Sequence, residues 1–395
     1  MWQDTKNVYH LSMAILANLL YRFPSRNLKI IGVTGTDGKT TTSSLIYQIL
    51  KYTGHDVSMI TSVGAIINNN EYPLGFHVTT PSPFKLQRFI KNAAISGNPK
   101  YLVLEVTSHS IDQHRIWGIP FEIGVLTNIT NEHLDYHKTY ENYLKTKAKL
   151  LKRAKIAVIN RDDQSYEHLK NIKEKRENLI TYGFSRESDV NPYNFNFKSV
   201  IDGEFNKYNI LAAITVCKKL GVEDSRIKEA IGHLSLPVAR MDTVYNGDFK
   251  IMIDFAHTPN ALEQILSSVR PGVKGRLIHV FGSAGERDAF KRAQMGNISS
   301  KYSDLIILTS EDPRSENPEK IMDQIGEGIN KNKKVIRIKD RLKAIETAVS
   351  EAKNGDFVLL TGKGHEKSMN MGNGEEPWSE YEAVEKVLGD AGIGS

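Results

Sequence analysis

A short apolar segment, a glycine-rich turn and a hydroxyl-rich segment follow one another near the start of the chain, and this succession constrains the fold most strongly. Residues 28–33 read LKIIGV, a run rich in β-branched side chains that predicts a buried strand. The next residues are Gly35-Thr36-Asp37-Gly38-Lys39-Thr40-Thr41, and residues 40–51 have the pattern of a helix. A strand, a glycine-rich turn and a helix in this order are typical of a phosphate-binding loop in an α/β domain.

The residue types in this turn suit a nucleoside triphosphate with Mg²⁺. Glycines allow backbone N–H groups to approach phosphate oxygens, and the start of a helix adds partial positive charge. Lys39 is placed to reach the terminal phosphates, and the Thr40 hydroxyl is placed to bind Mg²⁺. The spacing departs from the usual P-loop, which has its first glycine where this chain has Val33. The competing interpretation is a glycine turn that only joins a strand to a helix.

Apolar runs alternate with helical patterns along the rest of the chain. Strands are predicted in the first half at residues 101–106, 122–127, 155–159 and 179–182, with helices at 140–153 and 206–219. From about residue 240, strands are predicted at 249–254, 276–281, 304–309, 334–338 and 356–361, with helices at 259–269, 288–301, 318–330, 340–352 and 380–389. This alternation predicts an α/β protein of two doubly wound domains. The first is P-loop ATPase-like with a mostly parallel sheet, and the second is Rossmann-like.

The length of 395 residues also exceeds what one ordinary core supports. Pro237 interrupts the alternation of elements, which favours a boundary beside it. We therefore expect an N-terminal helical segment at 1–25, a first domain at 26–238 and a second at 239–395. The polar region 184–205 predicts loops or a short hairpin.

Charge and cysteine content exclude several classes of protein. Lys and Arg outnumber Asp and Glu by 52 to 46, without a basic cluster, which fits small anionic substrates and argues against nucleic acid. The single cysteine, Cys217, allows no internal disulfide and no cysteine-based zinc site. The apolar run 11–20 is too short to span a bilayer and lacks a signal-peptide cleavage site, so it predicts an amphipathic helix. We expect a cytoplasmic protein with no membrane partner.

The turn at residues 35–41 resembles the nucleotide loop of the Mur ligases, which build the peptide of peptidoglycan. Further motifs of that family follow in the family's order. They are Thr79-Thr80-Pro81, Glu105-Val-Thr-Ser-His109-Ser-Ile-Asp-Gln113, Thr127-Asn128-Ile-Thr-Asn-Glu-His133-Leu-Asp135-Tyr-His137, Phe205-Asn206-Lys-Tyr-Asn209, Asp254-Phe-Ala-His257-Thr-Pro259, Asp312-Pro-Arg314 and Gly362-Lys-Gly-His365-Glu366. Together they resemble the MurE branch, the UDP-N-acetylmuramoyl-tripeptide synthetases, over roughly residues 10–390.

The resemblance implies an ATP-dependent ligase of cell-wall biosynthesis. Such an enzyme activates a carboxylate as an acyl phosphate and couples it to an amino acid, releasing ADP and phosphate. It implies a central ATP-binding domain, a C-terminal amino-acid-binding domain and a monomer. MurE enzymes also carry an N-terminal domain for UDP, and here the nucleotide loop already begins at residue 35. We therefore expect that domain to be absent. Three interpretations follow: a shortened MurE-like enzyme, a relative that acts on a different carboxylate, or an enzyme whose UDP site a separate domain or protein supplies.

Two magnesium sites are implied by the resemblance, with Thr40, Glu105, His133 and Lys147 as the residues that hold them. Glu105 ends a predicted strand, and a carboxylate oxygen there suits Mg²⁺. Lys147 matches a family lysine that reacts with CO₂ and becomes a carbamate. The competing interpretations are that Glu105 caps a neighbouring loop, that His133 is a loop hydrogen-bonder and that the lysines of residues 145–149 are solvated.

Substrate-binding residues are also implied only by the resemblance. Those for the nucleotide, beyond the loop, are Asn209, Arg240, Asp254, His257 and Arg287. Those for the muramoyl-peptide-like carboxylate are Thr79, Thr80, Ser108, His109 and Arg115. The competing interpretation for Asn209, Asp254 and His257 is helix capping or loop hydrogen bonding. Ala239 replaces the glycine that the family has before the hinge arginine.

The amino-acid side chain is implied to bind at Asp312, Arg314, Gly362 and Glu366. Enzymes for meso-diaminopimelate carry Asp-Asn-Pro-Arg where this chain has Glu311-Asp312-Pro313-Arg314. An arginine can clamp a distal carboxylate with two parallel hydrogen bonds, and Glu366 can accept from the distal ammonium. We therefore expect a diaminopimelate-like substrate. The competing interpretation is that Arg314 pairs with a neighbouring surface glutamate, Glu311 or Glu316.

Two alternative functions remain open from the sequence. One is a ligase of the same mechanism with a non-UDP acceptor, of the polyamino-acid or folate type, against which Arg314 and the Gly-Lys-Gly-His-Glu motif argue. The other is a nucleotide-binding module without catalysis. A catalytically inactive relative is expected to have lost at least one of Lys39, Thr40, Glu105, His133 and Lys147.

Overall fold

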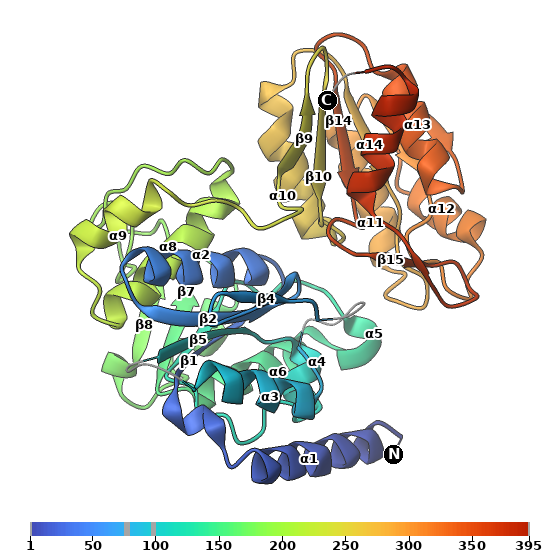
Figure 1. Cartoon of the computed structure of the whole chain (residues 1–395). Coiled ribbons are helices and arrows are strands. Elements are labelled where there is room, and N and C mark those ends of the chain that lie inside the picture. Colours follow the sequence, from blue (N-terminus) through green and yellow to red (C-terminus); the bar gives the residue numbers. More distant parts are fainter. Residues whose placement is uncertain (1, 75–79, 96–99, 394–395) are drawn as a thin grey trace. The chain divides into compact units, whose positions relative to one another are not determined.

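The computed structural model describes residues 2–74, 80–95 and 100–393, and the chain divides into two compact units, Met1–Pro237 and Val238–Ser395. Each unit is a sheet covered by helices on both faces (Figure 1). Both sheets are mostly parallel, which confirms the α/β class expected from alternating strands and helices.

The first unit contains an eight-stranded sheet in the order β4-β3-β2-β5-β1-β6-β7-β8. All neighbours from β2 to β8 pair in parallel, and β3 and β4 add an antiparallel edge. The strands are β1 (Lys29–Thr34), β2 (Asp56–Thr61), β3 (Gly64–Ile67), β4 (Asn70–Tyr72), β5 (Lys100–Glu105), β6 (Ile123–Leu126), β7 (Ile156–Asn160) and β8 (Leu179–Tyr182). The central strand β1 is buried from its second residue to its last, as parallel strands covered on both faces are.

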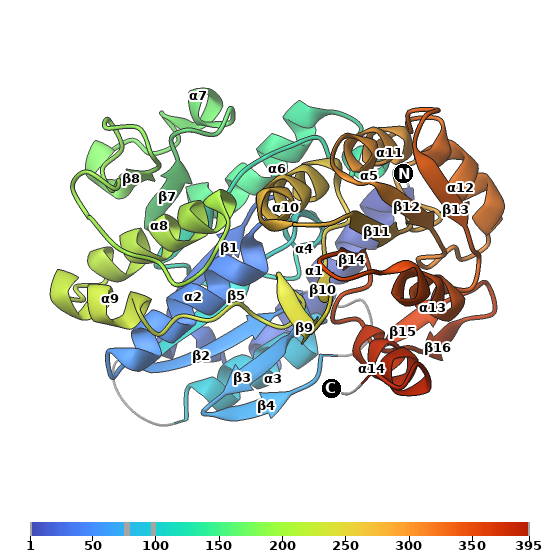
Figure 2. The same ribbon diagram turned by 90° about the horizontal axis from the view of Figure 1, so that it is seen from above.

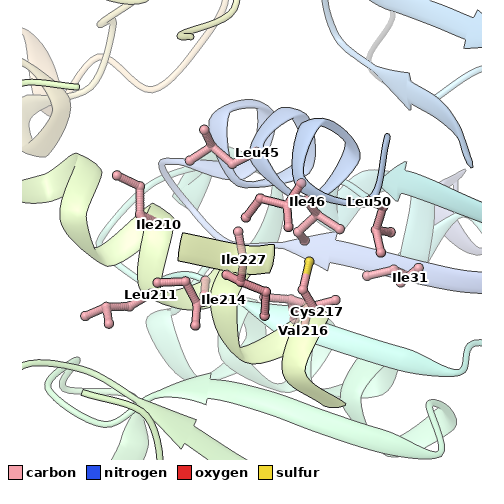
Figure 3. Close-up of a cluster of buried hydrophobic side chains, with 14 of the residues drawn as sticks. Ile31, Leu45, Ile46, Leu50, Ile210, Leu211, Ile214, Val216, Cys217 and Ile227 are labelled. Atoms are coloured by element: carbon pink, nitrogen blue, oxygen red, sulfur yellow. The ribbon is translucent and has the colours of Figure 1, made fainter. Parts of the chain in front are cut away.

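One face of this sheet is covered by α2 (Lys39–Tyr52), α8 (Glu204–Lys219) and α9 (Asp224–Ile231). Figure 3 shows side chains of these three helices meeting over β1, among them Ile46, Ile214, Cys217 and Ile227. Helix α8 is buried along most of its length because it lies between the sheet, α2 and α9. This packing fixes the start of α2, and with it the glycine-rich turn, at the carboxyl edge of the sheet.

The opposite face is covered by α3 (Pro83–Ala93), the short α4 (Ser108–Asp112) and α6 (Tyr140–Arg153). Helix α1 (Trp2–Leu20) packs on α3, and its Asn18 side chain donates a hydrogen bond of 2.9 Å to the carbonyl of Trp117. The short helices α5 (Leu134–His137) and α7 (Tyr166–Leu169) lie in the connections after β6 and β7.

The second unit has a six-stranded sheet in the order β13-β12-β11-β14-β10-β9, in which only β9 is antiparallel. Its strands are β9 (Asp242–Asn246), β10 (Lys250–Asp254), β11 (Leu277–Phe281), β12 (Leu305–Leu308), β13 (Lys334–Arg337) and β14 (Phe357–Thr361). Helices α10 (Pro259–Val269), α11 (Lys291–Tyr302) and α12 (Pro318–Gly326) cover one face, and α13 (Arg341–Glu351) and α14 (Glu380–Asp390) cover the other. Figure 2 shows this sheet from above, with the two-stranded ribbon of β15 (Ser368–Asn370) and β16 (Glu375–Pro377) beside it.

Several elements differ from the sequence-based expectations. Strands β2, β3, β4 and β9 and helices α3 and α9 were not predicted, because their segments are short or carry polar residues at buried positions, such as Ser58 and Thr61. Helix α11 begins at residue 291 rather than 288, and α12 ends at 326 rather than 330. Residues 184–203 form loops, one of the two expected arrangements, with an isolated bridge from Tyr182 to Val190, and α8 begins at Glu204.

No helix among residues 2–74, 80–95 and 100–393 combines the length and the apolar character needed to cross a membrane.

Candidate functional site

The glycine-rich turn joins the carboxyl end of β1 to the first residue of α2, as the sequence predicts. Gly38 is the N-cap of α2 with φ of 77°, and a Cβ there would lie 2.4 Å from Asn209 Oδ1, so the position requires glycine. A Cβ on Gly35 would lie 1.7 Å from the Thr127 hydroxyl oxygen. A side chain at either position would therefore have to displace Asn209 or Thr127.

The loop that follows β6 holds the turn in place. The Asn128 carbonyl accepts from the Thr36 amide at 2.9 Å, and Asn128 Oδ1 accepts from the Asp37 amide at 3.0 Å. The Thr127 hydroxyl donates to the Asp37 carbonyl at 2.6 Å. Thr127 and Asn128 thus preorganise the turn. Lys39 Nζ folds back to the Thr36 carbonyl at 2.7 Å, so the ammonium lies over the turn it would serve.

Thr40 and Glu105 form the first contact expected of a magnesium site. The Thr40 hydroxyl donates to Glu105 Oε2 at 3.0 Å, and both side chains are buried. Ser62, after β2, contributes its hydroxyl 3.0 Å from that of Thr40 and donates its amide to the same Glu105 oxygen at 3.0 Å. Thr41, the next residue of α2, is also buried. Oxygen atoms of Thr40, Ser62 and Glu105, from three segments of the chain, therefore lie close together. Such hard oxygen donors suit Mg²⁺.

Lys147 is a buried lysine beside the nucleotide loop. It is 1% exposed, and its Nζ donates to the Gly35 carbonyl at 2.6 Å. Burial, and then the positive charge of Lys39, lower the pKa of Lys147 well below its ordinary value. The solvated interpretation is therefore wrong for Lys147, whereas Lys145 and Lys149 on the same helix are exposed.

His133 lies in a cluster of aromatic rings near Lys147. Its backbone has φ of 55°, and its ring centroid is 4.9 Å from that of His109 and 6.2 Å from that of Tyr143. Lys147 Nζ lies 4.4 Å from the centroid of the same Tyr143 ring. Tyr143 therefore contacts both proposed metal-binding residues. His137, also in the cluster, has its pKa lowered to about 4, mainly by burial.

The predicted acceptor-binding residues lie around the end of β5. The Thr80 hydroxyl donates to the Glu105 carbonyl at 3.2 Å, and Arg115 donates to the Thr80 carbonyl at 3.2 Å. Ser108 is buried and lies 3.0 Å from His137 Nε2. The structure brings these residues, and His109, to the same edge of the sheet as the loop. Thr79 lies outside the described residues.

Asn209 contacts the start of α2 from α8. Its Oδ1 accepts from the Thr42 hydroxyl at 3.1 Å and its amide donates to Asn206 Oδ1 at 3.3 Å. Asn209 does not cap a helix, because it lies more than one turn inside α8 and its side chain bonds to Thr42 of α2.

In the second unit, Asp254 ends β10 and fixes the backbone after the boundary. Its two oxygens accept from the amides of Met241 at 2.8 Å and Ala256 at 2.7 Å, and burial raises its pKa. Ala239 is buried with φ of 57°, the left-handed conformation that the glycine of the family motif adopts without strain. The guanidinium of Arg240 lies 4.9 Å from the Phe255 ring centroid.

Two further residues that are predicted to bind the nucleotide, His257 and Arg287, lie at the carboxyl edge of this sheet. His257 follows β10, and its Nδ1 is 2.8 Å from the Phe255 carbonyl, so the loop hydrogen bond expected as the competing interpretation is present. Its carbonyl accepts from Lys291 at 2.9 Å. Arg287 is exposed in the connection between β11 and α11.

The predicted amino-acid residues gather where β12 and β14 end. Lys363 is fully buried, and its Nζ lies 3.0 Å from each oxygen of Asp312 and 2.7 Å from Glu366 Oε2. Arg314 donates to the Gly285 carbonyl at 3.2 Å. The pairing of Arg314 with a neighbouring glutamate is wrong, because Glu316 pairs with Arg292 at 2.9 Å and no ion pair of Arg314 occurs within the described part of the chain.

Glu311 is a buried acid that the sequence-based reasoning placed only as a possible partner of Arg314. A Cβ on Gly362 would lie 2.1 Å from its Oε2, so glycine at 362 makes room for this carboxyl group. Burial raises the pKa of Glu311 from 4.5 to about 7, against the lowering effects of Arg341, Lys291 and Lys363.

Sequence reasoning also missed Ser62, Tyr143 and Lys363. Ser62 has no motif around it, whereas Lys363 stands inside the Gly-Lys-Gly-His-Glu motif and Tyr143 lies one helical turn before Lys147. Across the residues with described positions, no three His, Cys, Asp or Glu side chains cluster in a way that could hold a metal ion.

Two family models match the chain. The Mur ligase middle domain matches residues 33–217, and the Mur ligase, glutamate ligase domain matches residues 239–364.

Curated relatives are similar over nearly the whole chain. A UDP-N-acetylmuramoyl-L-alanyl-D-glutamate–2,6-diaminopimelate ligase of Clostridium acetobutylicum is 37% identical, over 95% of this chain and 81% of that protein. The enzyme of the same name from Aquifex aeolicus is 39% identical, over 93% of this chain and 79% of that protein.

Solved structures agree in fold. A structure with the same diaminopimelate ligase name is 30% identical, with a TM-score of 0.61, over 93% of this chain and 79% of that one. The folylpolyglutamate synthase of Mycobacterium tuberculosis, complexed with ADP and AMPPCP, has a TM-score of 0.71 at 17% identity, over 89% of this chain and 92% of that one. The latter likeness shows the fold alone.

Proposed function

The chain belongs to the Mur ligase family, and from this premise we propose that it couples meso-diaminopimelate to the carboxylate of a UDP-muramoyl dipeptide. The family's enzymes are ATP-dependent ligases that use Mg²⁺, and this chain is such a ligase. The observation that carries the choice of substrates is the 37% identity, over 95% of the chain, to a ligase named for diaminopimelate and the muramoyl dipeptide.

The proposed reaction has two steps. A carboxylate oxygen of the dipeptide attacks the γ-phosphorus of ATP, the bond to ADP breaks, and an acyl phosphate forms. The amine of diaminopimelate then attacks the acyl carbon, phosphate leaves with the former carboxylate oxygen, and the nitrogen loses a proton. Catalysis of this kind depends on positioning and on neutralising charge rather than on a protein nucleophile.

The nucleotide loop is proposed to hold the triphosphate. Gly35 and Gly38 have no side chain that would keep phosphate oxygens away from the backbone N–H groups. Residues 38–42 form the start of α2, where the free N–H groups favour anions. Lys39 lies over the turn, with its Nζ bonded to the Thr36 carbonyl. Thr36, Asp37 and Thr41 complete the loop, and Asn209 lies against it from α8. We propose that Arg240, Asp254, His257 and Arg287 of the second unit bind the nucleotide during the reaction.

Two Mg²⁺ ions are proposed for this site. Thr40 and Glu105 fit the first, because their oxygens already lie 3.0 Å apart beside Lys39. Magnesium bound there supplies positive charge to the phosphate oxygens. His133 and Lys147 are proposed for the second. Lys147 fits a carbamate, because burial favours the neutral amine that reacts with CO₂, with loss of one proton.

The two organic substrates are proposed to bind at separate sites. The muramoyl peptide binds at Thr79, Thr80, Ser108, His109 and Arg115. The distal end of diaminopimelate binds at Asp312, Arg314, Gly362 and Glu366, where Arg314 offers a guanidinium to its carboxylate. The UDP moiety is proposed to bind a separate domain or protein. We also propose that the enzyme is a monomer and acts in the cytoplasm, where ATP is plentiful.

Phosphate release from ATP, measured with purified protein, Mg²⁺ and a panel of amino acids, tests this function. Diaminopimelate with UDP-muramoyl dipeptide is expected to give release that neither gives alone, and lysine is expected to be a much poorer partner. Release that depends on an acceptor without UDP would overturn the proposed acceptor. Release with lysine or another amino acid in preference to diaminopimelate would overturn the proposed amino acid.

A further inference from the structure

Lys363 occupies a position at which three loops of the second unit meet. Its buried ammonium bonds to Asp312, which follows β12, and to Glu366, which follows β14. Asp312 Oδ1 also accepts from the Asn370 amide at 2.8 Å, and its carbonyl accepts from the Gly285 amide at 2.9 Å. The contacts of Asp312 therefore link the β11, β12 and β14 loops.

The turn that carries Arg314 is constrained on both sides. Asp312 and Arg314 both have left-handed backbones, with φ of 43° and 54°, which non-glycine residues adopt only when their surroundings hold them there. The Arg314 amide donates to the Asn370 carbonyl at 3.0 Å, and Gly285 has no room for a Cβ, which would lie 1.9 Å from the Pro313 carbonyl oxygen.

Asp312 brings a charge that the Asp-Asn-Pro-Arg motif lacks at this position. An aspartate two residues from Arg314 is a natural ion-pair partner for that guanidinium. In the structure, Lys363 bonds to both of the aspartate's oxygens, and Arg314 bonds to a backbone carbonyl instead. Charge-assisted hydrogen bonds within a buried site are strong enough to decide between such pairings.

We propose that Lys363 is a positioning residue that keeps Asp312 away from Arg314, and so leaves the Arg314 guanidinium for the distal carboxylate of the amino-acid substrate. This inference rests on the proposed function, because it assumes that Arg314 binds that carboxylate. Lys363 thereby controls the preference for an amino acid with a distal carboxylate, although it does not itself contact the substrate.

Three variants test the proposal: Lys363→Met, Asp312→Asn and the double variant. In Lys363→Met, Asp312 loses its cation and is expected to pair with Arg314, so that the KM for diaminopimelate rises by roughly 10- to 100-fold. The KM for ATP is expected to stay within about twofold. Asp312→Asn removes the competing charge, and because Asp312 is itself proposed to bind the substrate, the KM of this variant for diaminopimelate is the reference for the double variant.

The double variant separates this role from a merely structural one. Without a carboxylate at 312, Arg314 stays available, so replacing Lys363 in the Asp312→Asn background is expected to change the KM for diaminopimelate by no more than roughly threefold. The preference for diaminopimelate over lysine is expected to narrow in Lys363→Met and to recover in the double variant. An unchanged KM in Lys363→Met would overturn the proposal, and so would a loss of Lys363 that raises the KM as much in the Asp312→Asn background as in the wild type.

A crystal structure of Lys363→Met provides a readout that does not depend on activity. An ion pair between Asp312 and Arg314 is expected. If Arg314 stays on the Gly285 carbonyl and Asp312 remains unpaired with it, the proposal is wrong even if the enzyme is active. An enzyme without dependence on diaminopimelate, whose Lys363→Met variant shows the new ion pair, would instead refute the proposed function and leave the pairing role of Lys363 standing.

Discussion

The Thr40 hydroxyl and the Glu105 carboxylate lie 3.0 Å apart, although 65 residues separate them in the chain. Thr40 is the second residue of α2, and Glu105 is the last of β5, the strand beside β1 in the sheet. Parallel neighbours end at the same edge of a sheet, and this edge is where α/β proteins place their ligands.

Replacement of Glu105 tests the first magnesium site. Glu105→Gln keeps the size and one carbonyl oxygen but removes the charge, so the Mg²⁺ concentration for half-maximal phosphate release is expected to rise roughly 10- to 100-fold. Glu122→Gln is the matched control, because Glu122 pairs with Lys155 at the protein surface. A Mg²⁺ dependence that is the same in both variants would remove Glu105 from the site.

Replacement of Lys39 tests the nucleotide loop. Lys39→Ala removes the cation proposed to stabilise the transferring phosphoryl group, and phosphate release is expected to fall by roughly 100- to 1000-fold. Lys51→Ala serves as the control, because Lys51 is exposed near the other end of α2. Wild-type rates of release from Lys39→Ala in the presence of both substrates would contradict the assignment of the nucleotide.

A carbamate on Lys147 is open to direct detection. After incubation with ¹³C-labelled bicarbonate, the wild type is expected to show a carbamate carbon resonance by NMR. The resonance is expected to vanish in Lys147→Met, together with activity, and to persist in Lys149→Met, because Lys149 is an exposed neighbour on the same helix. A wild-type spectrum without the resonance would count against the carbamate.

Gly38 and Gly54 flank α2 and form a matched pair. Both have left-handed backbones, with φ of 77° and 86°, so alanine at either is expected to cost about 1–2 kcal/mol of stability. Only at Gly38 would the new Cβ meet Asn209 Oδ1, at 2.4 Å, whereas nothing lies within 4 Å at Gly54. Gly38→Ala alone is therefore expected to raise the KM for ATP; equal KM values in the two variants would argue against a tight phosphate turn.

Glu311 is expected to make stability depend on pH. Because burial raises the pKa of Glu311 from 4.5 to about 7, the folded state keeps a proton that the unfolded state releases in this pH range. The contribution of this proton to the free energy of unfolding is fully present below pH 4.5 and is lost as the pH rises through about 7. The difference of 2.5 pH units corresponds to about 3 kcal/mol.

Urea unfolding at several pH values measures this effect. The free energy of unfolding of Glu311→Gln, relative to the wild type, is expected to increase between pH 4.5 and about 7 and to level off above. Glu319→Gln, at an exposed position in α12, is expected to show no such trend. A constant difference between Glu311→Gln and the wild type across this range would mean that Glu311 titrates normally.

The predicted strands that the structure confirms are those with continuous apolar runs, such as β1, β5 and β14. Burial on both faces of a parallel sheet demands such runs, so the sequence shows them. Strand β2 escaped prediction because Ser58 and Thr61 interrupt its pattern while being buried. Their environment comes from pairing with β5 and β3, which lie further along the chain.

At the candidate site, too, some residues were predictable from sequence and others were not. The motif around Lys39 and the acid at Glu105 were recognised from local residue types, whereas Ser62 was not, because a serine in a turn carries no signal of its own. For Lys147, resemblance alone singled it out of three lysines, and the structure supplies the physical distinction, which is burial under the Gly35 carbonyl.

The sequence by itself determined the α/β class, the position of the phosphate loop and the family, because these depend on apolar periodicity, on glycine where backbone must pass closely, and on motifs read in order. Tertiary structure alone decided which side chains share an environment. Lys363 holds Asp312 across 51 residues, and Thr40 meets Glu105 across 65, because sheet order brings distant strand ends to one edge. Burial then lowers the pKa of Lys147 and raises that of Glu311, since desolvation depends on what surrounds a group in space rather than on its neighbours in sequence.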